Sequence, residues 1–526
     1  MNQKISKPLS LRFFRDHWAI LTVMVIHSAI WLWIYHYITP HGDYIDHWMQ
    51  SRIWSMSYYE HPPMVALTIK AVTSIFGSTE MGLELSSLAF SLLTIALAYA
   101  LGCNFFDRKA GVFIILMMEA SPFFFAKAVS IQTEQPLVVF WMASIWVFYK
   151  YLKTGKNYWL IVLGLTTGLG ALSKYTTILF YMSVFIYFTI TRSKRSEWLN
   201  PWQYLGGLTS LAVFSPVLIW NIQNDWVSFK FQLAKGAVDE GIIFGRASLM
   251  FLLGVLAAYS IILVIWGYYR IGVYVRNCKL QTSSSLTHEF NSFLIVAAVV
   301  PIVFFVIALT RNEYHDPQWA VIAIISFYIW LGGESSRLWD QGKKGFLKVI
   351  FSSALLLNFV LFVLVFSISF MPELKVPYFR ENIVEQIFDW DVTVKQVEEV
   401  LLEKGYEKID YVIAPFYPLA SQFALHLKSQ PRTYSLDRTR RNLWSNPLDL
   451  NEQNTIAVCS KSCKLLHSRI GPVLGLKIEK LGEVNQEVTN VKRKVEFYRV
   501  TGKDYDLIDP HHREADYRIL KHLGID

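Results

Sequence analysis

Charged residues are scarce in this chain of 526 residues: Asp, Glu, Lys and Arg make up 17% of it, and hydrophobic residues 53%. Soluble domains carry roughly 25% charged residues, so most of this chain is not expected to face water. The sequence also has no Walker A motif, no dinucleotide-binding Gly-rich run, no zinc-ligand spacing and no nucleophile elbow. ATP- and NAD-dependent chemistry is therefore not supported.

Internal repeats and low-complexity tracts are absent as well, but long apolar runs are present. A helix needs roughly 20 residues to cross a bilayer. The runs cover 18–38, 80–102, 110–127, 136–152, 158–173, 175–191, 203–221, 247–270, 290–310, 317–333 and 346–370. We therefore predict a mainly α-helical, polytopic membrane domain over 1–370, with about eleven transmembrane helices.

Lys and Arg are distributed unevenly between the segments that join these runs. With the N-terminus in the cytoplasm, the cytoplasmic segments hold more than twice as many Lys and Arg residues as the opposite ones. The positive-inside rule favours this orientation, which places Asp43, Glu134, Lys174, Asp225 and His315 outside. The net charge of +9 follows from this topology. The sequence contains no basic helix with base-reading spacing, so a nucleic-acid partner is not indicated.

Hydropathy falls after Phe370, and residues 371–526 are predicted to form a small soluble α/β domain in the periplasm. The strand-like runs are 411–414, 455–458, 477–481 and 495–500, and the helical stretches are 392–404 and 418–427. Cys459 and Cys463 lie in this domain, where they form either a disulfide or two unpaired thiols at a strand end. Cys103 and Cys278 lie near the cytoplasmic side and are expected to stay reduced.

The outer segment 39–79 gathers carboxylates, histidines and aromatic residues directly after the first apolar run. Ionisable residues near a membrane are costly and usually functional. Asp43 is the first candidate, because a carboxylate here can act as a general base on an attacking hydroxyl group. The alternatives are a solvated loop aspartate or the N-cap of a helix that begins near Tyr44.

Two further outer loops carry ionisable candidates. Glu134 can share a site with Asp43 as base, substrate ligand or metal ligand, or it can simply begin the next helix, with Pro136 in the first turn. Lys174 is the one charge in a tight hairpin and suits a phosphate, although a snorkelling lysine fits equally.

Other outer-side residues are candidate substrate contacts. The aromatic ones can stack on a sugar or form an interfacial belt, and the amide and carboxylate groups can hold hydroxyls or cap helices. The set is Arg52, Tyr58, Tyr59, Glu60, His61, Asn221, Asp225 and His315.

Five motifs occur in a recognisable order: 42–44 (GDY), 58–64 (YYEHPPM), 132–137 (QTEQPL), 172–176 (LSKYT) and 215–232, which begins SPVLIWN. Together they resemble the bacterial membrane glycosyltransferases of the protein O-mannosyltransferase and aminoarabinose transferase superfamily, which have the GT-C fold. The resemblance spans most of residues 30–330.

The resemblance implies a sugar donor carried on polyprenyl phosphate, and a lipid, glycan or protein acceptor at the outer face of the bacterial inner membrane. In this reading 39–79 is the periplasmic catalytic loop and Asp43 is the general base. Glu134 stands in place of the usual second-loop aspartate, and Lys174 with nearby cations holds the lipid phosphate. The leaving phosphate needs electrostatic stabilisation.

The chain departs from the family pattern at a few positions. Tyr44 replaces the usual glutamate after Asp43, and Asp46, one helical turn on, is expected to compensate as a catalytic residue. Two carboxylates and several outer histidines permit a divalent metal ion, but they do not require one. The alternative function is a polytopic lipid or glycan flippase or transporter, which would also have about a dozen spans.

Overall fold

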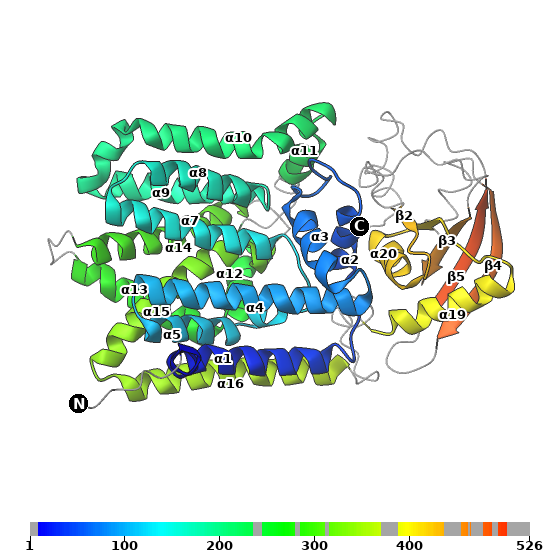
Figure 1. Cartoon of the computed structure of the whole chain (residues 1–526), viewed down its shortest axis with the longest axis horizontal. Coiled ribbons are helices and arrows are strands. Elements are labelled where there is room, and N and C mark those ends of the chain that lie inside the picture. Colours follow the sequence, from blue (N-terminus) through cyan, green and yellow to red (C-terminus); the bar gives the residue numbers. More distant parts are fainter. Residues whose placement is uncertain are drawn as a thin grey trace.

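The structure is a computed structural model that describes residues 9–234, 245–278, 285–310, 315–369, 388–435, 454–460, 463, 477–486 and 493–501. The described residues up to 369 form a bundle of helices, and those from 388 onward form a small layer of helices and strands beside one end of the bundle (Figure 1). The predicted fold class, mainly α-helical with a small C-terminal α/β domain, is confirmed. The predicted boundary at 370/371 lies outside the described residues.

The bundle consists of helices joined by loops and short 3-10 turns. They are α1 (Leu9–Ile34), α2 (Gly42–Ser51), α3 (Met64–Phe76), α4 (Glu80–Phe105), α5 (Arg108–Glu119), α6 (Pro122–Ala126), α7 (Glu134–Thr154), α8 (Tyr158–Ala171), α9 (Ile178–Ile190), α10 (Pro201–Gln223), α11 (Val227–Ala234), α12 (Arg246–Ala258), α13 (Ile261–Cys278), α14 (Leu286–Ala308), α15 (Val321–Asp340) and α16 (Lys344–Ser369). Short 3-10 turns lie at η1 (Tyr175–Thr177), η2 (Arg192–Leu199) and η3 (Pro317–Ala320). Several helices have a side-chain cap at their N-terminus. For example, Thr79 Oγ1 accepts a hydrogen bond from Gly82 N at 3.1 Å at the start of α4.

Every predicted apolar run lies on one or two of these helices. By length and composition, 6 of the described helices can each cross a membrane, and a seventh span results if α12 and α13 are counted together. The remaining runs are helical too, but α5, α8 and α9 are short and α7 carries charges at both ends. Fewer helices therefore pass this test than the eleven predicted, because several spans are shorter than the hydrocarbon thickness.

The sequence predicted one continuous span over 247–270. The structure instead has two helices, α12 and α13, that meet at 107°. The break lies at Tyr259 and Ser260, and Ser260 has a φ of 65°. A left-handed residue cannot continue an α-helix, so the chain turns at this point.

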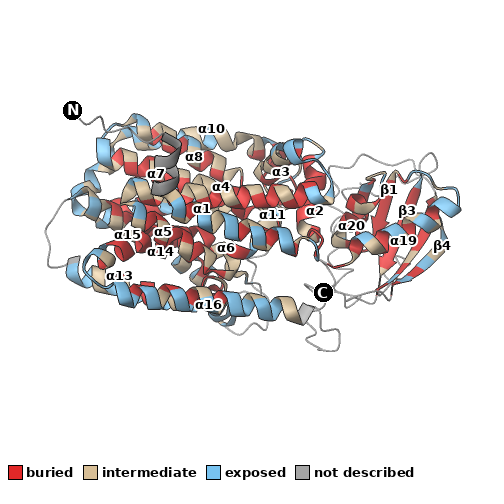
Figure 2. Ribbon diagram, turned by 60° about the horizontal axis from the view of Figure 1, so that its bottom comes forward, coloured by how far each residue is buried: buried red, intermediate tan, exposed pale blue. Residues whose placement is uncertain are grey.

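Burial in the bundle increases from the rim to the centre (Figure 2). α15 is buried along most of its length, whereas α10 and α16 show exposed residues along their outer faces. The exposed side chains of α16 include Leu356, Phe359 and Val360. Apolar side chains on the outer face of a helix are expected where the helix contacts lipid.

The C-terminal domain contains one sheet in the order β2-β1-β3-β5-β4. The strands are β1 (Tyr411–Ala414), β2 (Arg432–Ser435), β3 (Thr455–Ser460), β4 (Lys477–Gln486) and β5 (Arg493–Thr501), and the helices are α19 (Trp390–Glu403) and α20 (Tyr417–His426). β1 runs parallel to β2 and β3, and β5 runs antiparallel to β3 and β4. The four predicted strands and both predicted helices are confirmed, and β2 was not predicted.

Cys459 and Cys463 form a disulfide at the end of β3, with Cα atoms 5.5 Å apart. Of the two alternatives left open by the sequence, the structure has the bonded one. Disulfides persist in oxidising compartments, so this bond agrees with a domain outside the cytoplasm.

Removing this disulfide by the double change Cys459→Ser and Cys463→Ser is expected to lower the stability of the C-terminal domain by about 2 kcal/mol, because the bond closes only a short loop. Thermal unfolding of the native and double-serine proteins measures the difference. Thiol alkylation with and without reductant is the control, and an unchanged number of reactive thiols after reduction would contradict the bond.

Candidate functional site

Asp43 lies in the first turn of α2, at the end of the bundle that faces the C-terminal domain (Figure 1). His41 is the N-cap of this helix, and its Nδ1 accepts a hydrogen bond from Asp43 N at 3.2 Å. Asp43 is therefore not the N-cap that one sequence alternative proposed. Its carboxylate instead lies at the positive end of the helix, which favours the ionised form.

The Asp43 side chain is 39% exposed and has contacts from two directions. The Tyr417 hydroxyl, from α20 of the C-terminal domain, donates to Asp43 Oδ1. His41 Nδ1 lies 3.8 Å from Asp43 Oδ2. The carboxylate is thus held at one oxygen and remains accessible, as a proton acceptor must be.

Asp46 lies one turn further along α2 but is only 2% exposed. Gln50 Nε2 donates to Asp46 Oδ2 at 2.8 Å, and His47 Nδ1 lies 3.3 Å from Gln50 Oε1. The ring of His61 lies 5.7 Å from the ring of His47. Asp46 therefore belongs to a buried polar network beside Asp43.

Glu134 and Lys174 form an ion pair between the start of α7 and the turn before η1. The Lys174 ammonium donates to Glu134 Oε1, and the side chains are 13% and 3% exposed for Lys174 and Glu134. Thr133 Oγ1 lies 3.2 Å from Glu134 Oε2. The predicted first-turn position of Pro136 is confirmed, but Thr133 makes no side-chain cap bond.

Two more charged residues, Lys127 and Asp316, act on this pair electrostatically. Glu134 precedes the predicted span 136–152. Its burial would raise the pKa, but the ammonium groups of Lys174 and Lys127 outweigh this effect and lower the pKa to about 2. For Asp316, which precedes the span of α15, burial raises the pKa. Charges from three separate loops thus meet at one end of the bundle.

Asp43 and His61 also lie within electrostatic range of this cluster, Asp43 of Lys127 and His61 of Glu134. The structure therefore pairs two predicted residues, Glu134 and Lys174, and links the third, Asp43, to them through the charge of Lys127. Sequence reasoning missed Asp316 as a site residue. The available signal was its place in the predicted outer segment, after His315 and before Pro317, the same context that pointed to His315.

The other predicted residues of segment 58–61 mostly build the loop itself. Tyr58 is buried, and its hydroxyl donates to the carbonyl oxygens of Gln50 and Ile53, each at 2.8 Å. The Tyr59 ring packs 4.8 Å from the Phe231 ring.

The five remaining predicted contacts lie in different surroundings. The Glu60 carbonyl accepts from Gln232 Nε2 of α11 at 2.6 Å. Asn221 is fully buried and joins α10 to α11, because its Oδ1 accepts from Ser228 N at 3.2 Å. Arg52 lies over the Trp48 ring, 5.0 Å from its centroid, and donates to Gln430 O of the C-terminal domain at 2.9 Å. Asp225 and His315 are exposed.

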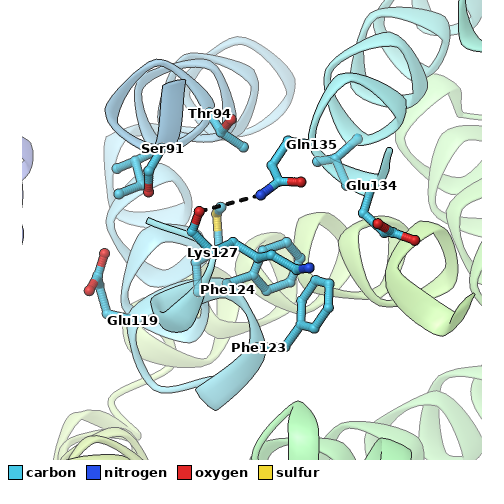
Figure 3. Close-up of a pocket in the computed structure, with 11 residues that line it drawn as sticks. Ser91, Thr94, Glu119, Phe123, Phe124, Lys127, Glu134 and Gln135 are labelled. Atoms are coloured by element: carbon cyan, nitrogen blue, oxygen red, sulfur yellow. Dashed lines mark hydrogen bonds between the residues drawn. The ribbon is translucent and has the colours of Figure 1, made fainter. Parts of the chain in front are cut away.

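A pocket lies on the side of Lys127 and Glu134 that faces α4 (Figure 3). Its empty volume, including space open to solvent, is about 440 Å³. Most of the lining is apolar, with Phe123 and Phe124 on one wall and Gln135 beside Lys127. Glu119 lies at the far side, where it contacts His27 of α1 at 3.1 Å. An apolar pocket with a cation at its rim suits an amphipathic ligand.

The residues described here offer one compact group of three possible metal ligands: Cys459, Cys463 and Glu496. The two sulfur atoms of this group are joined in the disulfide, so they are not thiolate ligands. At Glu134, Lys174 already supplies a counter-charge. No cofactor is established for the chain.

Comparison with known proteins identifies a family match and similar folds. Residues 60–220 match the family model of dolichyl-phosphate-mannose-protein mannosyltransferase. The search of curated proteins finds no match to this sequence. Among solved structures, ArnT from Cupriavidus metallidurans bound to undecaprenyl phosphate superposes with a TM-score of 0.56 at 14% identity, over 92% of this chain and 99% of that chain.

The chain has the fold of ArnT. The apo state of the same protein superposes with a TM-score of 0.53, over 91% of this chain and 98% of that chain. Because the match covers nearly all of both chains, it includes the C-terminal domain as well as the bundle. The GT-C resemblance stated from the sequence motifs is confirmed by the family model and by this ArnT-like fold.

Proposed function

We propose that the chain is an integral membrane glycosyltransferase that moves a sugar from a polyprenyl-phosphate donor to a lipid, glycan or protein acceptor. The observation that carries the proposal is the accessible Asp43 carboxylate within electrostatic range of a buried cluster that holds two lysines. The match to a mannosyltransferase family model and the fold of ArnT, which binds undecaprenyl phosphate, support it.

In the proposed reaction the hydroxyl oxygen of the acceptor attacks the anomeric carbon of the donor sugar, and Asp43 accepts the proton of that hydroxyl. The bond from that carbon to the phosphate oxygen breaks, and polyprenyl phosphate leaves with the electron pair. Lys174 has three N–H donors, so its ammonium can hold Glu134 and a phosphate oxygen at once. Lys127 adds a second positive charge, and together they stabilise the leaving group.

We further propose that the site faces the periplasm, with residues 1–370 in the inner membrane and 371–526 outside. The uneven distribution of Lys and Arg and the Cys459–Cys463 disulfide both support this orientation.

A flippase or transporter is the second candidate. The broken helix α12–α13 favours it, because many transporters build their binding sites from interrupted helices. The site charges favour the transferase, since they gather at one end of the bundle next to the C-terminal domain.

The purified protein is expected to transfer radiolabelled sugar from polyprenyl-phosphate donors to acceptor in detergent or vesicles, and to release polyprenyl phosphate. The assay counts label in lipid, glycan and protein fractions, with and without a chelator to test for a divalent metal requirement. Transport of labelled lipid between vesicle leaflets without a new glycosidic product would contradict the transferase and support the flippase.

A further inference from the structure

The helix that begins with Tyr417 packs directly on the helix that carries the proposed base. Tyr44, Ile45 and Trp48 of α2 share one buried apolar cluster with Ala424 and Leu425 of α20. Figure 1 shows α20 beside α2 at the junction of the two parts. The C-terminal domain is therefore docked on the catalytic segment by a buried apolar contact.

Polar contacts surround this apolar contact. Gln422 Nε2 donates to Pro40 O at 3.1 Å, just before α2. Gln430 Nε2 donates to Ser78 O at 2.9 Å, after α3. With the bond from Arg52 to the Gln430 carbonyl, these contacts fix α20 and the turn that follows it to the segment 40–78.

Gly42 makes the closest approach between the two helices. A Cβ atom at this position would lie 2.8 Å from Pro418 Cβ and 3.0 Å from Pro418 Cα. Real Cβ atoms do not approach other atoms this closely, so any side chain at Gly42 must push α20 away. The glycine directly before Asp43 is thus required by the docked domain.

Next to this contact, the Tyr417 hydroxyl donates to Asp43 Oδ1. A hydrogen bond to a carboxylate is strong and directional, so the Tyr417 hydroxyl fixes the orientation of the Asp43 carboxylate. The Tyr417 residue comes from a different domain, so this orientation depends on docking.

We propose that the C-terminal domain is part of the catalytic apparatus, with Tyr417 as the residue that positions Asp43 for proton abstraction. This inference rests on the proposed glycosyltransferase function. It adds that transfer requires α20 to be docked on α2, so the soluble domain does more than cover the site or bind acceptor.

Tyr417→Phe tests the positioning role, because it removes the hydroxyl and keeps the ring. The kcat for transfer is expected to fall roughly tenfold while the KM for the donor changes less than about twofold, since the bond acts on the base and not on donor binding. Tyr498→Phe is the matched control: its hydroxyl also donates to a carboxylate, that of Glu496, in the same domain but on β5. Equal kcat values for native protein and Tyr417→Phe would overturn the inference.

Gly42→Ala tests the docking requirement, because the added methyl group collides with Pro418. Transfer is expected to fall roughly tenfold or more, and the second change Pro418→Gly, which removes the colliding Cβ, is expected to recover part of it. Gly207→Ala is the control, since a Cβ there meets nothing within 4 Å. Full transfer by Gly42→Ala would show that docking is not needed.

The experiments distinguish failure of the proposed positioning role from failure of the proposed function. If the native chain transfers sugar and Asp43→Asn does not, but Tyr417→Phe equals the native chain, the proposed function stands and the positioning role falls. If Asp43→Asn transfers at the native rate, the base assignment falls and the positioning role falls with it.

Discussion

Replacing Asp43 by asparagine is expected to lower the rate of sugar transfer by about 10²- to 10⁴-fold, the usual contribution of a general base. Asparagine has nearly the same shape, and its carbonyl oxygen can still accept the bond from Tyr417. The amide cannot take up a proton at neutral pH, so the change removes the chemistry and leaves the geometry. Transfer from a radiolabelled polyprenyl-phosphate sugar measures the loss.

Asp391→Asn is the matched control for this variant. Asp391 is an exposed carboxylate in the first turn of α19, so the same loss of charge occurs in the C-terminal domain, on a different helix from Tyr417. Thermal unfolding and expression are expected to be unchanged in both variants. Transfer that survives Asp43→Asn would move the base to Asp46 or Glu134, which Asp46→Asn and Glu134→Gln then separate.

Lys174→Met is expected to have the largest effect on stability, because it leaves the buried Glu134 carboxylate without its ion-pair partner. Breaking one side of a buried ion pair lowers the free energy of unfolding by about 3–5 kcal/mol. The expected value is at the low end, since Lys127 still acts on Glu134. Donor binding is expected to weaken in parallel, through loss of a phosphate contact.

The double variant Lys174→Met with Glu134→Gln separates these two effects. Removing both charges together relieves the unpaired buried charge, so thermal stability is expected to recover. The KM for the donor is expected to stay raised, because the phosphate contact remains lost. Recovery of both stability and donor KM would show that Lys174 acts only as the partner of Glu134.

Much of the fold could be predicted from local patterns in the sequence. Each apolar run lies on one or two helices, because lipid offers no hydrogen-bond partners and a helix pairs its backbone N–H and C=O groups internally. The strands 411–414 and 455–458 were found from β-branched residues in short runs. β2 (Arg432–Ser435) was missed because its central residues alternate polar and aromatic without a long apolar stretch.

The candidate site could be predicted only in part. Asp43, Glu134 and Lys174 stood out because charges are rare near apolar runs. The sequence did not indicate that Glu134 and Lys174 pair with each other, since they lie 40 positions apart. It also did not indicate that Tyr58 and Asn221 would be used internally, because both residue types fit sugar contacts and internal hydrogen bonds equally.

The sequence by itself determined the helical membrane class, the loops that carry ionisable residues and the small α/β domain, since hydropathy and periodicity are local properties of the chain. The tertiary structure alone decided that Asp316 joins the lysine cluster, that the chain turns at Ser260, and that Tyr417 reaches Asp43 across 374 positions. Such contacts depend on how distant helices pack, and packing leaves no periodic signal in the segments that it joins.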